Sequence, residues 1–496
     1  MRGAKEKIRV RLAPSPTGAF HFGTARTALF NWLFARQHTG TFVVRMEDTD
    51  AARSKPEYED NLMQGLSWLG LSWDEGPDWK DEKGKRHREK GKHGPYRQSE
   101  RKKKYRMYLR ALLESHNAYV CYCTKEEIEA QRESMLAEGL PPRYNGHCRA
   151  LESPPEGRAP QAIRFRTPEI RVEFRDLIRG NVSFDAALFG DFIIAKGEDS
   201  PLYNFAVVVD DELMSITHVI RGEDHLPNTP KQILLQSALK FRELAYAHVP
   251  LILGSDRSKL SKRYAETSLL AYREKGFLPD AMVNFLALLG WHPKDNREIL
   301  SREELVSAFD LKRIQKSGAI FDGEKLEWMN AERLHAMSDA AILEAMLENP
   351  EFEKRIREMR VEKARLLKIL SVEKQRMKTL ADFFELASFF VELPGYESAL
   401  LLWQKDPRKK TAAILKELLV ILEMNAATAP CDRAALEKAL APITKREGNG
   451  SVLWPLRVAL SGKAASPDPY EIIGVLGCAE SAARVRLAIE KLEKIA

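Results

Sequence analysis

The sequence has few cysteines, no long apolar run and no strong excess of one charge. Five cysteines in 496 residues are too sparse for a disulfide scaffold, and we expect a protein of the reducing cytoplasm. No run of about 18 apolar residues occurs, so no membrane span is predicted. The basic start of the chain is followed by no apolar stretch typical of a signal peptide. A net charge of +7 permits a polyanionic partner but does not require one.

The first 50 residues carry the pattern of a strand, a helix and a second strand. Ile8 to Leu12 is a short extended run, and apolar residues then recur at helical spacing from Ala25 to Leu33. After Gly40, the β-branched and apolar run Thr41 to Met46 predicts the second strand. Strand–helix–strand at this spacing predicts a parallel sheet in an α/β fold of the Rossmann type.

Three later regions complete the coarse prediction. Further strands are predicted at Phe205 to Val209 and at His218 to Arg221. The charged stretch Lys80 to His93 offers nothing to a core and predicts a disordered surface loop, with RNA contact as the secondary interpretation. From about Ser338 onward the pattern is helical throughout, which predicts a separate all-α region.

The loop between the first strand and its helix has the chemistry of a nucleotide site. It runs from Ala13 through Pro14 to Thr24, at the carboxyl edge of the predicted sheet, where such folds bind ligands. Small residues such as Gly23 let a nucleotide approach the backbone, and the helix start offers free N–H groups to phosphates. His21 can donate a hydrogen bond to a phosphate oxygen.

A second fragment, KLSKR, occupies residues 259 to 263 in a polar loop. Two lysines, Lys259 and Lys262, suit the negative charge that develops on a pyrophosphate leaving group. Taken alone, the fragment is more consistent with a solvated basic loop.

Taken together, the two loops resemble the HIGH and KMSKS signatures of class I aminoacyl-tRNA synthetases, in order and in separation. The segments around them resemble the bacterial glutamyl-tRNA synthetase family over nearly the whole chain. These segments are Arg45 to Asp50, Gly94 to Arg101, Leu202 to Asp211, Thr217 to Pro230, Phe277 to Trp291 and Trp454 to Gly462.

The resemblance implies an ATP-dependent ligase that forms glutamyl-adenylate, with Mg²⁺ accompanying ATP, and passes the glutamyl group to the 3′ end of tRNA. It implies that tRNA is required even for activation. His21, Thr24, Lys259, Lys262 and Arg263 are the catalytic candidates, and Pro14 and Gly23 join His21 and Lys262 in binding ATP.

The resemblance also implies a site for glutamate, which carries two carboxylates and one ammonium group. Arg11, Tyr203 and Arg221 match positions that hold glutamate, with Ser15 alongside, and Glu47 matches the acid that faces the ammonium. Arginine suits this task because its planar fork meets a carboxylate with two parallel hydrogen bonds. Which arginine takes which carboxylate stays open.

Three clustered cysteines predict a structural zinc site, because structural zinc is tetrahedral and rich in sulfur ligands. Cys121, Cys123 and Cys148 match an arrangement found in some members of the family, with Tyr144 as the fourth ligand. His147 is chemically a better ligand, so the choice between the two stays open. The alternative is three buried cysteines that bind no metal.

The resemblance divides the chain into five segments and predicts a monomer with tRNA and glutamate as partners and no membrane contact. Residues 1–106 and 210–253 form the catalytic Rossmann domain, interrupted by an α+β insertion at 107–209 that binds the acceptor stem. Residues 254–338 form a stem-contact region, and residues 339–496 form the helical anticodon-binding domain.

Three rival functions remain. Glutaminyl-tRNA synthetase shares the catalytic core, but its anticodon region is built of β-barrels. A form that also charges tRNA(Gln) with glutamate is the nearer alternative, and a catalytically inactive RNA-binding paralogue is the remote one.

Overall fold

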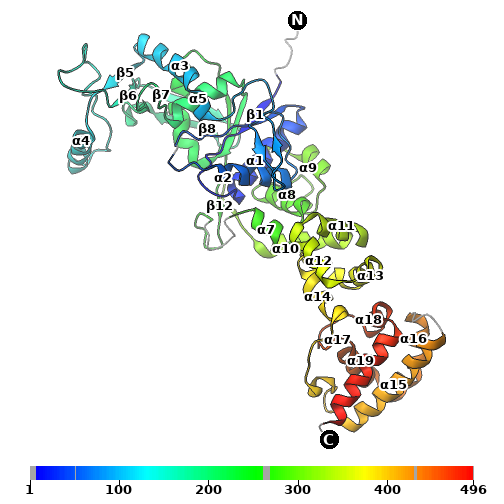
Figure 1. Ribbon diagram of the computed structural model, residues 1–496. Coiled ribbons are helices and arrows are strands. Elements are labelled where there is room, and N and C mark those ends of the chain that lie inside the picture. Colours follow the sequence, from blue (N-terminus) through cyan, green and yellow to red (C-terminus); the bar gives the residue numbers. More distant parts are fainter. Residues whose placement is uncertain (1–6, 51, 261–267, 429–432, 495–496) are drawn as a thin grey trace. The chain divides into compact units, whose positions relative to one another are not determined.

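The computed structural model describes residues 7–50, 52–260, 268–428 and 433–494. These residues form two structural units, coloured along the chain in Figure 1. Unit 1 comprises residues 1–273 and 279–326, and unit 2 comprises residues 274–278 and 327–496. Within the described ranges, every helix is too short or too polar to cross a lipid bilayer.

The N-terminal strand–helix–strand unit is present as predicted. It consists of β1 (Arg9–Leu12), α1 (Phe22–Gln37) and β2 (Thr41–Val44), and the two strands pair in parallel. Gly40 permits the return from α1 to β2, because a Cβ atom at this position would lie 2.6 Å from the backbone oxygen of Ile8. The periodic apolar face of α1 is buried against the sheet.

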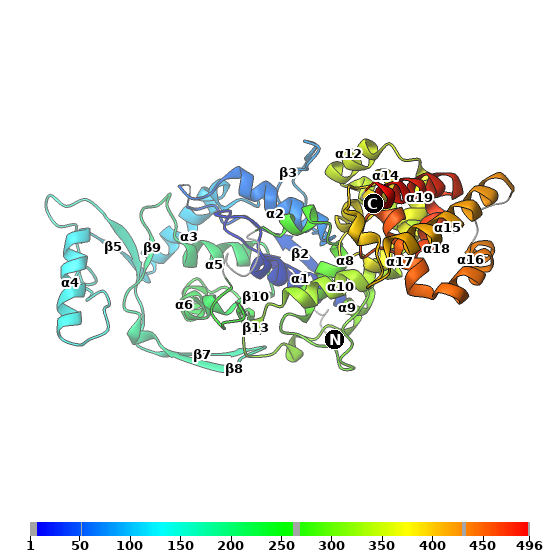
Figure 2. The same ribbon diagram turned by 90° about the horizontal axis from the view of Figure 1, so that it is seen from below.

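A second, four-stranded sheet adjoins this pair and brings distant segments to one edge. β10 (His218–Gly222) follows Thr217, whose N–H donates to the Arg9 carbonyl oxygen at 2.9 Å. β11 (Ala245–Val249) pairs in parallel with β10 and meets the end of β7 (Arg171–Asp176). β7 also forms a long antiparallel hairpin with β8 (Gly180–Asp185), seen in Figure 2. We call the edge where β1, β2, β10, β11 and β7 end the carboxyl edge.

The predicted strand at Phe205 to Val209 is wrong. These residues lie inside the helix α5 (Tyr203–Leu213) and are buried against α6 (Thr229–Ala238) and a small sheet. A helix that is buried on all sides is apolar at every position, so a short apolar run does not distinguish it from a central strand. The strand predicted at His218 to Arg221 is confirmed as β10.

The insertion within unit 1 contains a second, antiparallel sheet. Its order is β5-β6-β9, and its strands are β5 (Ala118–Cys121), β6 (Ala162–Phe165) and β9 (Ile193–Ala195). α3 (Lys102–Glu114) packs on this sheet together with α5, and α4 (Lys125–Ala137) follows β5 after a capping box at Thr124. The insertion is therefore of the predicted α+β type.

The basic stretch Lys80 to His93 is a surface element but is not disordered. β3 (Trp79–Lys80) and β4 (Arg86–His87) form an antiparallel hairpin. The rings of Trp79 and His87 stack with centroids 4.5 Å apart, and His87 also pairs with Asp81. Aromatic stacking and a local hydrogen bond therefore order a segment whose composition alone predicts disorder.

The rest of unit 1 and all of unit 2 are mainly helical. Unit 1 also contains α2 (Pro56–Trp68), α8 (Pro279–Leu288), α9 (Arg302–Ala308) and the short parallel pair β12 (Ile252–Leu253) and β13 (Ala319–Ile320). The chain passes between the units three times: within α7 (Leu270–Glu274), just before α8, and within α10 (Gly323–Ala336).

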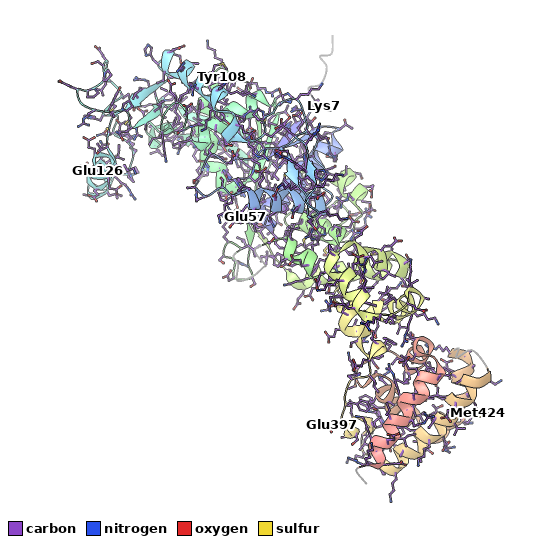
Figure 3. All side chains as sticks on the ribbon, in the orientation of Figure 1. Lys7, Glu57, Tyr108, Glu126, Glu397 and Met424 are labelled. Carbon is purple, nitrogen blue, oxygen red and sulfur yellow. The ribbon has the colours of Figure 1, made fainter. Side chains whose placement is uncertain are left out.

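Unit 2 contains no strand among its described residues, which confirms the predicted all-α region. Side chains fill the space between its helices (Figure 3), and α15 and α19 lie side by side. Its helices are α11 (Asp339–Glu348), α12 (Pro350–Met359), α13 (Lys363–Glu373), α14 (Asp382–Val391), α15 (Arg408–Thr428), α16 (Arg433–Glu447), α17 (Asn449–Ser461), α18 (Pro469–Leu476) and α19 (Cys478–Glu493).

Candidate active site

His21 caps the amino end of α1 and is held by local hydrogen bonds. Its Nδ1 accepts from the Gly23 N–H at 3.2 Å, and its Nε2 lies 3.2 Å from the Thr24 hydroxyl. Because Nδ1 accepts, the neutral ring carries its proton on Nε2. Partial burial of the ring lowers the pKa of His21 below its usual value, and the positive charge of Lys259 lowers it further. The ring is therefore neutral near pH 7 and presents an N–H donor beside a helix start.

Lys259 lies close enough to His21 to influence its titration, and it pairs loosely with Asp224. The Lys259 Nζ is 3.8 Å from the Asp224 carboxylate, and both side chains are at least half exposed. An exposed pair at this distance is weak, so Lys259 remains free to exchange partners. Lys262 and Arg263, predicted to act with it, lie outside the described residues.

Arg221 is a buried guanidinium at the end of β10 that touches only neutral side chains. Its Nη2 donates to the Thr229 hydroxyl and to the Gln232 amide oxygen, both at 2.8 Å. Its Nε donates to His248 Nε2 at 3.3 Å, and its Nη1 donates to the Tyr203 hydroxyl at 3.4 Å. Among the described residues, no carboxylate lies within ion-pair distance of it. The second N–H of Nη1 has no hydrogen-bond partner among the described residues.

Arg11, at the end of β1, belongs to a buried network of charges. Its Nε and Nη2 donate to the two Asp211 carboxylate oxygens at 3.2 and 3.4 Å. Arg45 donates to the same carboxylate at 2.7 Å and to Glu47 Oε1 at 3.1 Å. Burial raises the pKa of Glu47 although both arginines oppose it. In Asp211 the arginines outweigh burial and lower the carboxyl pKa.

Asp210 extends this network beneath the carboxyl edge. Its carboxylate accepts hydrogen bonds from Arg101 Nε at 2.6 Å, from the Gln98 amide at 2.8 Å and from the Tyr105 hydroxyl at 2.8 Å. Arg45 Nε lies 3.8 Å from the same carboxylate. Three guanidinium groups and three carboxylates thus share one solvent-free region, and their formal charges cancel.

Tyr203 stands between the two arginines. Its hydroxyl lies 2.9 Å from His225 Nδ1 and accepts from Arg221. Burial raises the pKa of Tyr203, and the charges of Arg221, Glu47 and Arg11 all reach it. Four of the predicted glutamate-site residues therefore converge. The fifth, Ser15, is exposed in the loop that follows β1.

Sequence reasoning assigned no role to Arg45, Asp210, Asp211, Arg101 or His248. The segments that contain the first four stood among those that carry the family resemblance. Nothing in the sequence indicated which of their polar residues point inward.

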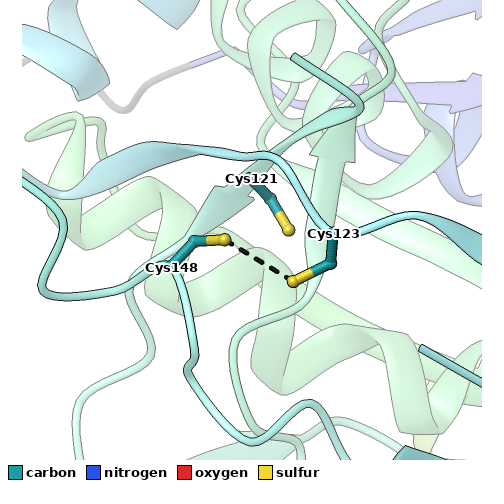
Figure 4. Close-up of side chains that lie close together, drawn as sticks. All are labelled: Cys121, Cys123 and Cys148. Carbon is teal, nitrogen blue, oxygen red and sulfur yellow. Dashed lines mark hydrogen bonds between the residues drawn. The ribbon is translucent and has the colours of Figure 1, made fainter. Parts of the chain in front are cut away.

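The three cysteines Cys121, Cys123 and Cys148 come together as Figure 4 shows. Their sulfur atoms all lie within 4.8 Å of one another, and those of Cys123 and Cys148 are 3.5 Å apart. The Tyr144 hydroxyl lies 3.7 Å from Cys121 Sγ and 3.5 Å from Cys123 Sγ. Burial raises the pKa of Cys123 to about 11. His147 is exposed. Its backbone N–H donates to the side-chain oxygen of Asn145.

Comparison with known proteins identifies relatives over both units. The family model "tRNA synthetases class I (E and Q), catalytic domain" matches residues 7–328, and "Anticodon binding domain" matches residues 333–489. The glutamate–tRNA ligase of Heliobacterium modesticaldum is 44% identical, covering 98% of this chain and 97% of that protein. That of Aquifex aeolicus is 43% identical and covers 98% and 99%.

Solved structures give the same result. A glutamate tRNA ligase from Elizabethkingia meningosepticum, crystallised with its amino acid, has a TM-score of 0.85 and 34% identity over 98% of this chain and 100% of that chain. The enzyme from Elizabethkingia anophelis has a TM-score of 0.83 and 33% identity, with the same coverage.

Proposed function

Since the chain belongs to the glutamate–tRNA ligases of the class I tRNA synthetases, we propose specific roles for the residues at its carboxyl edge. The activity is that of an aminoacyl-tRNA ligase. A glutamate carboxylate oxygen attacks the α-phosphorus of ATP, and the bond to pyrophosphate breaks. A hydroxyl of the terminal tRNA adenosine then attacks the acyl carbon, and AMP leaves.

The α1 end of the carboxyl edge binds the triphosphate. When ATP binds, His21 turns its Nε2 proton from the Thr24 hydroxyl to a phosphate oxygen, and the Thr24 hydroxyl is then available to the triphosphate as well. Gly23 keeps the backbone open, because a Cβ there would lie 3.1 Å from the His21 ring. Pro14 lines the loop on the sheet side. Lys259, with Lys262 and Arg263, neutralises charge on the departing pyrophosphate.

The β10 end binds glutamate, and Arg221 is the observation that carries this assignment. A buried guanidinium without a carboxylate partner is costly unless an anion arrives. Its remaining Nη1 proton and the Tyr203 hydroxyl provide two polar contacts for a carboxylate. Glutamine at the same position leaves part of that charge unmatched, which disfavours it.

Arg11 and Glu47 complete the glutamate site. Asp211 engages the Nε and Nη2 of Arg11, which leaves Nη1 for the second carboxylate of the substrate. Arg45 engages one oxygen of Glu47, and the other oxygen is available to the substrate ammonium. Ser15 lies in the loop beside them. The sheet edge therefore offers two cationic groups and one anionic group, which match the charges of glutamate.

The helical unit 2 supports the glutamate enzyme over the glutamine enzyme. Glutaminyl-tRNA synthetases carry β-barrels in the anticodon region, whereas the described part of unit 2 has no strand. We assign residues 339–496 to anticodon binding, 107–209 to the acceptor stem and 254–338 to stem contact. Residues 1–106 and 210–253 form the catalytic domain. The chain acts as a cytoplasmic monomer.

The cysteine cluster fits a structural zinc ion. Tetrahedral zinc with bonds to sulfur of about 2.3 Å separates its ligand sulfurs by about 3.8 Å. The Cys123 and Cys148 sulfurs are 3.5 Å apart and no sulfur pair of the cluster is more than 4.8 Å apart, which is compatible with this value. We propose Cys121, Cys123 and Cys148 as ligands and Tyr144 as the fourth, because its hydroxyl already faces two of the sulfurs. The ion would hold the β5 end of the insertion and take no part in the reaction.

Purified protein tests the proposal directly. With ATP, tRNA(Glu) and radiolabelled pyrophosphate, we expect exchange of label into ATP with glutamate and at most a trace with glutamine. Attachment of labelled glutamate to tRNA(Glu) and to tRNA(Gln), assayed separately, decides between a discriminating and a non-discriminating ligase. Absence of glutamate-dependent exchange in folded protein with tRNA present would reject the enzymatic role.

A further inference from the structure

A buried histidine and aspartate stand behind Arg221, and the chemistry above does not use them. His248 lies on β11 directly opposite Arg221 on β10. Asp176 is the last residue of β7, which meets β11 beside Tyr246. Neither His248 nor Asp176 exposes its side chain to solvent. Adjacent parallel strands therefore place the three groups in a row at the carboxyl edge.

The hydrogen bonds in this row have a defined direction. His248 Nδ1 lies 2.7 Å from an Asp176 oxygen, and the same carboxylate accepts the His248 backbone N–H at 3.1 Å. Asp176 also accepts the N–H groups of Ile178 and Arg179 at 2.9 and 2.8 Å. The backbone N–H groups can only donate to Asp176, and the pKa of this carboxyl is lowered although burial opposes it, so the carboxylate is ionised. Because an ionised carboxylate only accepts, the ring proton of His248 lies on Nδ1. His248 Nε2 is left as an acceptor, and Arg221 Nε donates to it.

We propose that Asp176 and His248 are positioning residues that hold Arg221 for the substrate carboxylate, an inference that rests on the proposed glutamate site. Asp176 supplies the negative charge that a buried guanidinium needs, but it does so through a neutral imidazole. A carboxylate placed directly on Arg221 would occupy the donors that glutamate uses. The positive charge of Arg221 is therefore compensated by Asp176 through His248, while its Nη1 stays available to the substrate carboxylate.

The remaining contacts of Arg221 fit this interpretation. The Gln232 amide N–H₂ donates to the Asn204 side-chain oxygen at 3.0 Å, which fixes the Gln232 oxygen toward Arg221. Thr229 lies 2.9 Å from His248 Nε2 and accepts from Arg221 Nη2. Nε and Nη2 are therefore fully committed to the protein, and only Nη1 faces the substrate.

The Asp176→Asn variant tests the relay because it preserves shape and inverts the proton order. If the amide oxygen serves the backbone N–H groups of Ile178 and Arg179, the amide N–H₂ faces His248 Nδ1, which must then accept, and the His248 backbone N–H loses its 3.1 Å bond. The ring proton of His248 then lies on Nε2. Two donors, this N–H and the Nε–H of Arg221, face each other, and the hydrogen bond between them is lost. A change from carboxylate to amide beside a histidine is known to force the wrong tautomer with little change in geometry.

In aminoacylation with saturating tRNA, we expect Asp176→Asn to raise KM for glutamate about ten- to hundredfold, the range for loss of a hydrogen bond to a charged group. KM for ATP should stay within about twofold, since the triphosphate lies at the α1 end. His248→Ala should behave similarly. His248→Gln should retain more affinity, because its amide oxygen can accept from Arg221.

Two further measurements keep the test decisive. Histidine ¹⁵N NMR should show the Nδ1–H tautomer for His248 in the parent and the Nε2–H tautomer in Asp176→Asn. Tyr246→Phe is the matched control, because Tyr246 is buried beside His248 and its hydroxyl bonds to Gln236, outside the relay. An Nε2–H tautomer in the parent overturns the proposal. So does a glutamate KM that is unchanged in folded Asp176→Asn, or that rises no more than KM for ATP.

If Asp176→Asn does not fold, the His248 tautomer in the parent and the glutamate KM of the two His248 variants still test the proposal. Activity of the parent with glutamate and tRNA is measured first in the same assay. Its absence counts against the proposed function, whereas parent activity with insensitive variants counts against the relay alone.

Discussion

Replacement of Arg45 by methionine offers a sharp test of the buried network that supports the glutamate site. Arg45 is fully buried and contacts the carboxylates of Asp211 and Glu47, with Asp210 at 3.8 Å. In the parent, three guanidinium groups balance three carboxylates. Methionine fills a similar volume but leaves one buried negative charge uncompensated. Removal of one partner from a buried ion pair typically costs about 3–5 kcal/mol, and we expect a loss of this size in the free energy of unfolding.

The loss should depend on pH in a defined direction. Burial already raises the pKa of Glu47, and the attraction of Arg45 is the largest influence that opposes the rise. Without Arg45 the folded-state pKa of Glu47 lies still further above its unfolded value. A carboxyl of this kind destabilises the fold above its folded pKa, and this cost disappears as protonation restores neutrality at lower pH. The deficit of the variant should therefore be larger at pH 8 than at pH 5.

Urea unfolding at both pH values measures the effect, and hydrogen exchange of amides in β1 and β2 assigns it to this sheet. Arg110→Met is the matched control, because Arg110 pairs with Glu198 at an exposed site and its loss should change nothing measurable. A deficit for Arg45→Met below about 1 kcal/mol would refute the reasoning, since that is the size expected of a surface pair. An equal deficit at both pH values would refute the assigned direction.

Three further outcomes follow from local geometry. Gly23→Ala should lower kcat of activation about tenfold or more by displacing the His21 ring, whereas Gly474→Ala in α18, where a Cβ meets nothing within 4 Å, should leave it unchanged. Equal effects of the two would contradict the assigned role of the turn. Elemental analysis of the parent should find about one zinc ion per chain, and Cys123→Ser should lose it; a zinc-free parent, purified without chelators, would dismiss the site. Arg221→Met should raise KM for glutamate about thirtyfold or more with KM for ATP little changed, and parallel rises in both would show a general loss of structure.

Local sequence patterns predicted many of the secondary-structure elements and site residues of this protein. The spacing of apolar residues and the position of turn residues predicted β1, α1 and β2, because each element forms from contacts within a few residues along the chain. The two loops and the matched motifs named residues at the carboxyl edge, and the cysteine spacing named the cluster in the insertion. The same reasoning failed at Phe205 to Val209, where complete burial removed the periodicity that separates a helix from a strand. It also failed at the Lys80 to His93 hairpin, whose order comes from a stacked ring and a local hydrogen bond.

The partners of each site residue were decided only by the tertiary structure. Arg11 and Asp211 are 200 positions apart, and Asp176 and His248 are 72 apart, yet each pair shares hydrogen bonds in the interior. In the sequence, any of these side chains could equally have been a solvated surface charge. The parallel strand order brings their carboxyl ends together, and exclusion of water there requires each charge to find its complement. The sequence named the groups that meet glutamate and ATP, and the folded sheet alone determined what holds those groups in place.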